Sequence, residues 1–244
     1  MASGLLASGT LAALAASDSE ASARLRAPME MLRDDEDGWR AAADLLAEGR
    51  IVGIPTDTIY GVAAPVAAPG VVARLFPLKD RELGKPLAVL VADLNQAREL
   101  VEVSPLAEAV AARWWPGALT IVLPRTERFD VDLGGAGDTV GVRCPAHHRV
   151  VELCRRMGPL ATTSANRSGR PTPAAAADVA LALDGTEVAA VLDGGVLVAS
   201  ASTVVRVDGD EIEVLREGAV SARELAGVVA EADRFPRPEG TVAS

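Results

Sequence analysis

Short apolar runs alternate along the chain with segments in which apolar residues recur at helical spacing. The apolar runs predict buried strands at 51–55, 87–91, 119–123, 139–143, 160–163, 189–192, 203–207 and 212–215. Caps and helical periodicity predict helices at 37–48, 70–78, from 93, 105–115, 149–157, 172–183 and from 221, the second disturbed by Pro77. Strands that alternate with helices in this way are typical of a mixed α/β domain.

The alternation extends from Met29 to about Ala232, so one domain is predicted over 29–232. Residues 1–28 are rich in Ala, Ser and Gly, and are interpreted as a disordered extension or as sequence upstream of a true start at Met29 or Met31. Residues 233–244 are expected to form a flexible tail. No apolar run is long enough to cross a membrane as a helix.

The charge of the chain limits the class of partner. With 24 Lys and Arg against 34 Asp and Glu, the formal net charge is −10 at pH 7, which argues against a dedicated nucleic-acid binder. Lysine occurs only at Lys79 and Lys85, on either side of Arg81. This basic cluster is either a chance feature of a solvated helix end or a phosphate site that needs a compact ammonium group. The spacing alone favours neither interpretation.

Cysteine and histidine are scarce. Cys144 and Cys154 do not form a zinc motif or a disulfide framework, and they are interpreted as buried, reduced thiols of a cytoplasmic protein. His147 and His148 are adjacent and have no nucleophile motif such as G-x-S-x-G to serve, so a surface or helix-capping role is expected. No cluster of metal-ligating residues is found in the sequence.

Polar residues gather where the predicted strands begin or end. Because ligands of open α/β sheets bind at strand ends, these residues are candidates for a shared site. The loop 164–169 has hydroxyls, Asn and Gly that suit a nucleotide, although an ordinary Asx or ST turn has the same composition. There is neither a P-loop nor a G-x-G-x-x-G motif. The candidate segments are Thr56-Asp57-Thr58, Thr139 with Arg143, Ser164-Ala165-Asn166, Ser202-Thr203 and Arg216.

Together these segments resemble a known family, the threonylcarbamoyl-AMP synthases built on a YrdC-like domain. The resemblance covers roughly Gly53 to Val220 and implies a single YrdC-like domain, in which helices flank a twisted mixed β-sheet around a concave substrate cleft. It rests on Pro55-Thr56-Asp57-Thr58-Ile59-Tyr60-Gly61, Lys79-Asp80-Arg81, Lys85-Pro86-Leu87, Trp115-Pro116-Gly117, Thr139-Val140-Gly141-Val142-Arg143, Ser164-Ala165-Asn166-Arg167-Ser168-Gly169, Ser202-Thr203-Val204-Val205 and Leu215-Arg216-Glu217-Gly218.

The resemblance implies a nucleotidyltransferase that makes L-threonylcarbamoyl-AMP and pyrophosphate from L-threonine, bicarbonate or CO2, and ATP. A threonylcarbamoyl-transferase complex then modifies adenosine beside the anticodon of certain tRNAs, so tRNA is an indirect or weak partner. The nucleophile is an anionic carbamate, so the enzyme has to position two anions and offset their repulsion. Mg²⁺ is expected to arrive with ATP, without a metal ligand from a protein side chain.

Site residues are implied by matching motif positions. Lys79 and Arg81 would be catalytic, acting on the triphosphate. Arg143 would hold the threonine carboxylate with a two-pronged contact. The residues implied for ATP are Arg81, Lys85, Thr139, Ser164, Asn166, Thr172 and Arg216, and those implied for threonine are Thr58, Arg143, Thr162 and Ser202.

Three other functions stay open at this point. A carbamoyl-transfer enzyme could use the same fold with carbamoyl phosphate or a carbamoyl-adenylate. A non-catalytic protein could present a basic concave face to RNA, although the net charge of −10 disfavours it. A domain with decayed activity is suggested by Ala201, which stands where many members of the family have Glu.

Overall fold

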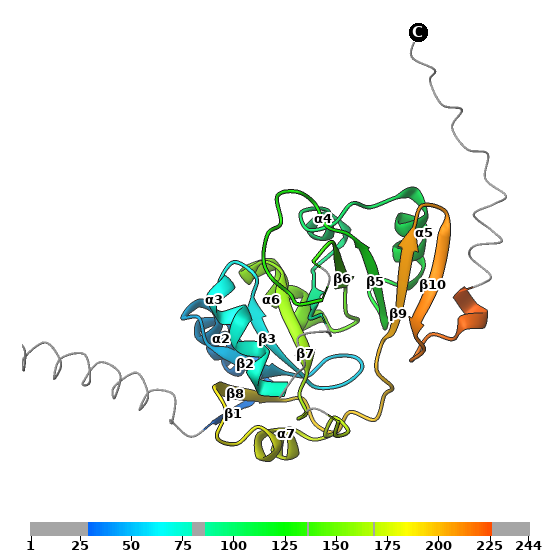
Figure 1. The fold of residues 1–244 in the computed structure, drawn as a ribbon. Coiled ribbons are helices and arrows are strands. Elements are labelled where there is room, and N and C mark those ends of the chain that lie inside the picture. Colours follow the sequence, from blue (N-terminus) through cyan, green and yellow to red (C-terminus); the bar gives the residue numbers. More distant parts are fainter. Residues whose placement is uncertain (1–28, 80–85, 136, 168, 226–244) are drawn as a thin grey trace, which may run out of the picture.

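The computed structural model of the chain describes residues 29–79, 86–135, 137–167 and 169–225 (Figure 1). The predicted extension 1–28 and tail 233–244 lie outside the described residues, so both stay predictions. Among the described residues, no helix is long and apolar enough to cross a membrane.

Ten strands form one mixed sheet in the order β1-β8-β2-β3-β7-β4-β6-β5-β9-β10. Parallel pairs, such as β4 with β6 and β5 with β9, stand beside antiparallel pairs, such as β3 with β7 and β5 with β6. The expected α/β fold with a mixed sheet is therefore confirmed. The strands are β1 (Glu30–Arg33), β2 (Ile51–Ile54), β3 (Gly61–Pro65), β4 (Ala88–Leu90), β5 (Leu119–Pro124), β6 (Thr139–Arg143), β7 (Leu160–Ser164), β8 (Val188–Asp193), β9 (Thr203–Asp208) and β10 (Glu211–Arg216).

The helices flank the sheet as expected. Two of them, α2 and α6, pack side by side next to β2 and β3, while α5 packs on β5 and α7 on β8 (Figure 1). The helices are α2 (Glu36–Ala47), α3 (Pro69–Val72), α4 (Leu94–Arg98), α5 (Pro105–Trp114), α6 (His148–Met157) and α7 (Ala176–Ala182), with 3₁₀ turns η1 (Ala73–Leu75) and η2 (Pro77–Lys79).

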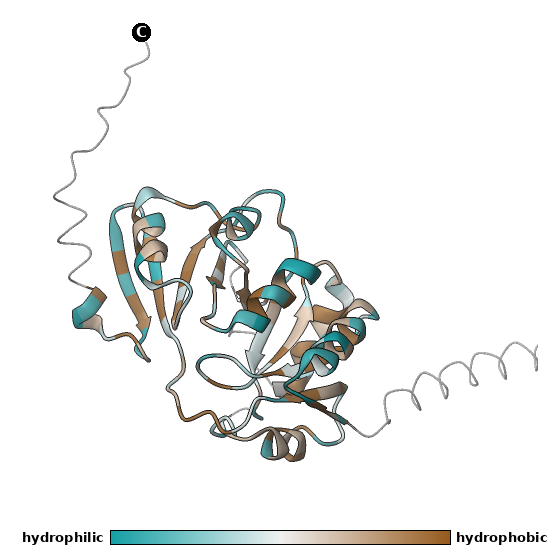
Figure 2. Ribbon diagram, turned by 180° about the vertical axis from the view of Figure 1, so that it is seen from behind, coloured by the Kyte–Doolittle hydropathy of each residue, from teal (hydrophilic) through white to brown (hydrophobic). Residues whose placement is uncertain are grey.

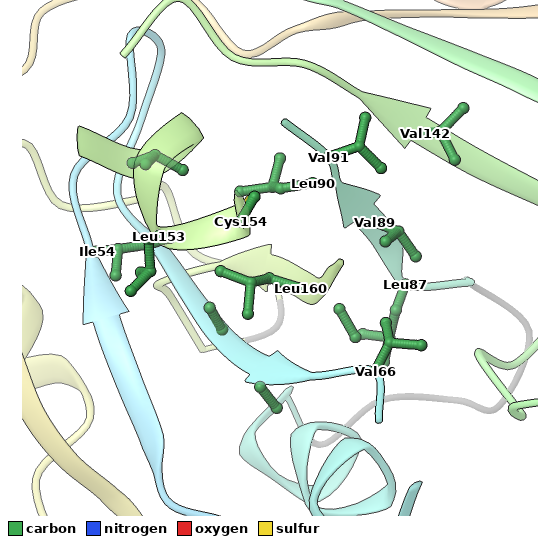
Figure 3. Close-up of a cluster of buried hydrophobic side chains, with 14 of the residues drawn as sticks. Ile54, Val66, Leu87, Val89, Leu90, Val91, Val142, Leu153, Cys154 and Leu160 are labelled. Carbon is green, nitrogen blue, oxygen red and sulfur yellow. The ribbon is translucent and has the colours of Figure 1, made fainter. Parts of the chain in front are cut away.

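The hydrophobic core lies between the sheet and its helices. Figure 3 shows Leu153 and Cys154 of α6 beside Leu160 of β7 and Ile54 of β2. The core is built mainly from Val, Leu, Ile and Ala, as the low aromatic content of 3% requires. Figure 2 shows the corresponding pattern, with hydrophobic strands inside and hydrophilic positions on the outer faces of the helices.

Two strands were not predicted from the sequence. The β3 residues Gly-Val-Ala-Ala-Pro are all buried, but Gly, Ala and Pro have low strand propensity and give no signal. The pairing of β3 with β2 and β7 on either side stabilises it as a strand. The other missed strand, β1, is an exposed edge strand that pairs only with β8 among the described elements.

Two predicted helices were partly wrong. The segment 70–78 is not one helix but α3 followed by two 3₁₀ turns, because Pro77 has no backbone N–H to donate. The helix predicted to be capped by Thr172 begins instead at Ala176, with Ala175 as an N-cap that makes no side-chain hydrogen bond. The Thr172 hydroxyl donates to Asn166 (3.2 Å), so it belongs to the preceding loop.

The expected helix cap at the histidine pair and the expected burial of the two cysteines are confirmed. His147 is the N-cap of α6, and its Nδ1 accepts a hydrogen bond from the Val150 N–H (3.4 Å). Cys144 and Cys154 are both buried and free, and the Cys144 thiol donates to the carbonyl of Ala92. Burial raises the pKa of the Cys144 thiol to about 11, so it stays protonated and unreactive at neutral pH.

Candidate functional site

A cavity of about 460 Å³ opens over one face of the central strands. Three β6 residues, Thr139, Gly141 and Arg143, line it, while Val140 and Val142 between them are buried in the core. Alternate residues of a strand point to opposite faces, so this one strand separates the cavity from the core. The sequence predicted a site at strand ends; the structure places it across the face of the sheet as well.

Small side chains keep the floor of the cavity open. Gly141 lies opposite Ala88 of β4 on one side and Val122 of β5 on the other. A Cβ on Gly141 would stand 3.3 Å from the Thr120 methyl group, so a larger side chain there would press on this methyl group. Similarly, a Cβ on Gly61 would stand 3.0 Å from the Thr162 hydroxyl oxygen.

Arg143 is the buried cation of the cavity, with 6% of its surface exposed. Its Nη2 pairs with Asp57 (2.5 Å), its Nη1 donates to the Thr58 hydroxyl (2.8 Å), and its Nε donates to the Gly117 carbonyl (2.9 Å). Burial lowers the pKa of Arg143, and the neighbouring Asp57 carboxylate acts in the opposite direction. Three of the five guanidinium N–H donors are used, and two remain for a ligand.

The turn that carries Asp57 is held by Thr56. The Thr56 hydroxyl donates to the Ile59 carbonyl (2.7 Å) and accepts from the N–H groups of Thr58 and Ile59. This ST-type turn fixes the backbone directly before β3. Thr58, which is 1% exposed, thereby meets Arg143 at the end of β6.

The same turn is tied to the connection between β8 and β9. The Tyr60 hydroxyl donates to the Gly195 carbonyl (2.8 Å), and burial raises the pKa of Tyr60 to about 12. Gly194 lies so close to Pro55 that a Cβ would come within 2.5 Å of the proline Cβ. These contacts anchor the start of the segment that crosses to β9 and leads to Ser202.

Asn166 organises the loop after β7. Its Oδ1 accepts from the hydroxyls of Ser164 (2.6 Å) and Thr172 (3.2 Å), and its Nδ2 donates to the carbonyls of Arg167 and Arg170. One amide therefore links both ends of the loop, as its place in the motif predicts. Ser164, Asn166 and Thr172 all line the cavity.

The opposite wall is formed where β9 begins and β10 ends. Arg216 Nη2 donates to the carbonyl (2.8 Å) and hydroxyl (3.3 Å) of Ser202. The buried Thr203 hydroxyl donates to the Val220 carbonyl and accepts from the N–H groups of Gly218 and Val220. This arrangement holds the turn after Arg216 against the start of β9.

The cavity suits an anion. Arg143, Arg170 and Arg216 line it, and none of the described residues that line it is acidic. In a chain of net charge −10, this is a local concentration of positive charge. The surrounding hydroxyls and backbone groups add hydrogen-bond donors for phosphate or carboxylate oxygens.

The structure brings together every predicted site residue that it describes in full. Those implied for ATP and those implied for threonine share one cavity, which agrees with a two-substrate site but does not assign their ligands. They are Thr58, Thr139, Arg143, Thr162, Ser164, Asn166, Thr172, Ser202 and Arg216.

The basic cluster is only partly described. The backbone of Lys79 ends η2, whereas Arg81 and Lys85 lie outside the described residues. The chain re-enters the described part at Pro86, which lines the cavity. The catalytic role of Lys79 and Arg81 and the ATP contact of Lys85 therefore stay predictions from the sequence.

Sequence reasoning missed three features of the site. Asp57 was noted only as part of a turn, because its pairing with Arg143 over 86 residues depends on the fold. Thr120 and Val122 alternate along β5 and both line the cavity, so the strand period was a signal for Thr120. A threonine in an apolar run, however, is also an ordinary strand residue. Arg170 is an exposed loop arginine and gave no signal.

The similarity to known proteins covers the region of the chain that contains these site residues. The sequence model of the Sua5/YciO/YrdC family, described as telomere recombination, matches residues 44–218. A threonylcarbamoyl-AMP synthase from Pyrococcus abyssi is 36% identical over 216 residues, which is 86% of this chain and 63% of that protein. A putative threonylcarbamoyl-AMP synthase from Mycobacterium tuberculosis is 38% identical over 194 residues, which is 79% of this chain and 89% of the other.

Solved structures agree with the sequence comparison. The crystal structure of P. abyssi Sua5 complexed with L-threonine superposes with a TM-score of 0.77 at 35% identity, covering 83% of this chain and 61% of that one. The present chain thus spans less than two thirds of the length of the P. abyssi protein.

Proposed function

The chain belongs to the Sua5/YciO/YrdC family, and from this membership and the cavity we propose that it is an L-threonylcarbamoyladenylate synthase. In the proposed reaction, L-threonine, CO2 from bicarbonate, and ATP give threonylcarbamoyl-AMP and pyrophosphate. Relatives with this name, and a related structure that holds L-threonine, support the proposal.

The observation that carries the proposal is a single cavity lined by two separately held arginines. Arg143 is buried beside Thr58, and Arg216 is held on Ser202. A condensation of two anions needs such an arrangement, because each anion has to be held while the repulsion between them is offset. The cavity volume of about 460 Å³ lies within the range of small-molecule sites.

The amino acid is proposed to bind at the Arg143 end. The two unused N–H donors of Arg143 can hold its carboxylate, while Asp57 and the Gly117 carbonyl fix the guanidinium plane. Thr58, Thr162 and Ser202 supply hydroxyls around the remaining polar groups. Thr162 donates to the Val62 carbonyl (3.0 Å), so its oxygen is left to accept, which suits an ammonium or carbamate N–H.

The chemical step needs no strong general base. The threonine amine adds to CO2 and loses a proton to form a carbamate, and that proton is balanced by the one that bicarbonate takes up when it releases CO2 and water. A carbamate oxygen then forms a bond to the α-phosphorus of ATP. The bond from the α-phosphorus to the bridging oxygen breaks, and pyrophosphate leaves with the electron pair. The protein is proposed to contribute alignment and charge stabilisation.

ATP is proposed to occupy the other end of the cavity, beside Thr139, Ser164, Thr172 and Arg216, with Asn166 ordering the loop. Lys79, Arg81 and Lys85 are proposed to meet the triphosphate, on the strength of the sequence motif. Hydroxyls and guanidinium groups are poor magnesium ligands, and no three His, Cys, Asp or Glu side chains gather among the described residues. The site thus fits Mg²⁺ held by the ATP phosphates, where the ion would neutralise phosphate charge.

Downstream steps are proposed from the family alone. The product is a reactive mixed anhydride, so an acyl-transfer complex has to deliver its threonylcarbamoyl group to tRNA. The buried, reduced Cys144 and Cys154 agree with a cytoplasmic location.

A substrate panel tests the proposed function. We expect pyrophosphate release from ATP to require both L-threonine and bicarbonate, and the adenylate-linked product to be seen by mass spectrometry. Serine, valine and carbamoyl phosphate serve as comparisons. Release with carbamoyl phosphate in place of threonine would favour a carbamoyl-transfer enzyme, and tight tRNA binding without turnover would favour an RNA-binding protein.

Two arginines of one loop allow a matched test of the ATP end. Arg170 lines the cavity, and in the described part of the chain its side chain has no hydrogen bond or ion pair. The Arg167 side chain instead donates to the carbonyls of Ala182 and Asp184 at the end of α7. We expect Arg170→Gln to raise the KM for ATP about tenfold, the loss of one charge-assisted contact, with an unchanged KM for threonine.

Arg167→Gln is the control for this prediction, because it removes an equal charge from the same loop. Its KM for ATP should stay within about twofold of the wild-type value. Equal effects of the two substitutions would mean that loop charge in general, rather than contact from Arg170, supports ATP binding.

A further inference from the structure

A hydrogen-bond chain connects Thr120, Ser202 and Arg216 in the lining of the cavity. The Thr120 and Ser202 hydroxyl oxygens lie 3.0 Å apart, and Arg216 Nη2 donates to the Ser202 hydroxyl (3.3 Å). Thr120 is 5% exposed and Ser202 is 7% exposed, and both line the cavity. Two buried hydroxyls and an arginine are therefore connected at the boundary between the two proposed substrates.

The position of the Thr120 hydroxyl is set by the sheet. Thr120 lies on β5, opposite Val204 of β9, and its neighbour Leu119 lies opposite Thr203. Its methyl group stands on the β6 side, against Gly141. A β-branched side chain has few χ1 rotamers, so packing of the methyl group on this side keeps the hydroxyl on Ser202.

The donors and acceptors of Ser202 can then be counted. A serine hydroxyl has one proton and two lone pairs. Arg216 fills one lone pair. If Thr120 donates to the other, the Ser202 proton is left for a ligand; if Ser202 donates to Thr120, a lone pair is left instead.

Once an anion is in the cavity, its charge decides which of the two hydroxyls, Thr120 or Ser202, donates the hydrogen bond between them. A lone pair of Ser202 facing a carboxylate or carbamate oxygen is repulsive. With Thr120 as donor, the hydrogen bonds run head to tail from Thr120 through Ser202 to the anion and strengthen one another.

We propose that Thr120 is a positioning residue that donates to Ser202 and thereby directs the Ser202 proton to an anionic oxygen of the amino-acid substrate. The inference rests on the proposed function, which supplies the anionic amino acid. Thr120 acts through Ser202 and needs no contact of its own with either substrate.

Removing the Thr120 hydroxyl tests the proposal. We expect Thr120→Val to raise the Kd of L-threonine, measured by calorimetry, and its KM about tenfold, because Ser202 loses its directing donor. The KM for ATP should change less than about twofold. Thr120→Ser keeps the hydroxyl and should restore the Kd and the KM of L-threonine. A purely structural role of the threonine methyl group would not produce this rescue.

A double-mutant cycle tests whether Thr120 acts through Ser202. Ser202→Ala should weaken threonine binding at least as much as Thr120→Val, and the double variant should be no weaker than Ser202→Ala alone. Thr126→Val, which removes a hydroxyl that donates to the Glu99 carbonyl on the surface, is the matched control and should match wild type. Thermal unfolding shows whether each variant is folded.

The outcomes separate this inference from the proposed function. Additive effects in the cycle, a Thr120→Val variant with wild-type affinity, or failure of Thr120→Ser to rescue would each overturn the role of Thr120. Threonine binding by wild type without turnover would contradict the proposed function, while the affinities would still decide the role of Thr120. If the wild-type protein binds no threonine, both the proposed function and the role of Thr120 are contradicted.

Discussion

Replacement of Arg143 by methionine is expected to remove threonine-dependent turnover and to lower the free energy of unfolding by about 3–5 kcal/mol, the usual cost of breaking a buried ion pair. The Asp57 side chain, 14% exposed, would lose its charged partner, and the Gly117 carbonyl and Thr58 hydroxyl would each lose a donor. A pyrophosphate-release assay measures the turnover, chemical denaturation measures the free energy of unfolding, and calorimetric titration with L-threonine measures the affinity.

Two further variants separate stability from binding. Arg143→Met combined with Asp57→Asn removes the uncompensated carboxylate and should recover part of the stability, but none of the threonine affinity. Arg40→Met removes an arginine whose side chain is 57% exposed and should change stability by less than about 0.5 kcal/mol. Wild-type affinity for threonine in a folded Arg143→Met protein would contradict the proposed role of Arg143.

The second large effect is expected from Gly218→Ala. A Cβ at this position would stand 2.2 Å from the Ala201 carbonyl oxygen and 2.7 Å from the Ser202 carbonyl carbon, and both are backbone atoms that cannot turn away. The turn after β10 would have to move off β9, and the contact between Arg216 and Ser202 would move with it. We expect turnover to fall about a hundredfold, as for a displacement of about 1 Å in an active site.

The same substitution should lower the free energy of unfolding by about 1–3 kcal/mol, as overpacking does. Gly70→Ala is its control, because Gly70 lies in α3 and a Cβ there meets nothing within 4 Å. Since alanine is the better helix former, this variant should equal or exceed wild type in stability at full activity. If Gly218→Ala retains full activity, the close approach of β9 and the turn is not needed for the site.

The sequence predicted the fold where apolar patterning was strong. Runs such as 119–123 and 139–143 are strands within a residue of their predicted bounds, because their Val, Leu and Ile side chains supply core contacts. β3 could not be predicted, since its Gly, Ala and Pro residues are strand-forming only between β2 and β7. Local propensity was overridden there by tertiary pairing.

The site was predictable to the extent that its motifs are local. Ser164, Asn166 and Thr172 lie within nine residues and form one hydrogen-bonded loop. The pairing of Asp57 with Arg143 could not be inferred, because it depends on the strand order that places β6 near the turn before β3. Thr120 was hidden for a similar reason: its partner Ser202 is 82 residues away, directly before the neighbouring strand β9.

The most direct test of the account is to follow labelled carbon into the product. The purified protein is incubated with ¹⁴C-bicarbonate, ATP, Mg²⁺ and L-threonine, and the adenylate fraction is separated and counted. We predict label in a product that contains AMP and threonine in equal amounts, formed with one pyrophosphate per label and absent when threonine is left out. Pyrophosphate release without label in the adenylate, or label that does not depend on threonine, would contradict the proposal that this cavity joins a carboxylated threonine to AMP.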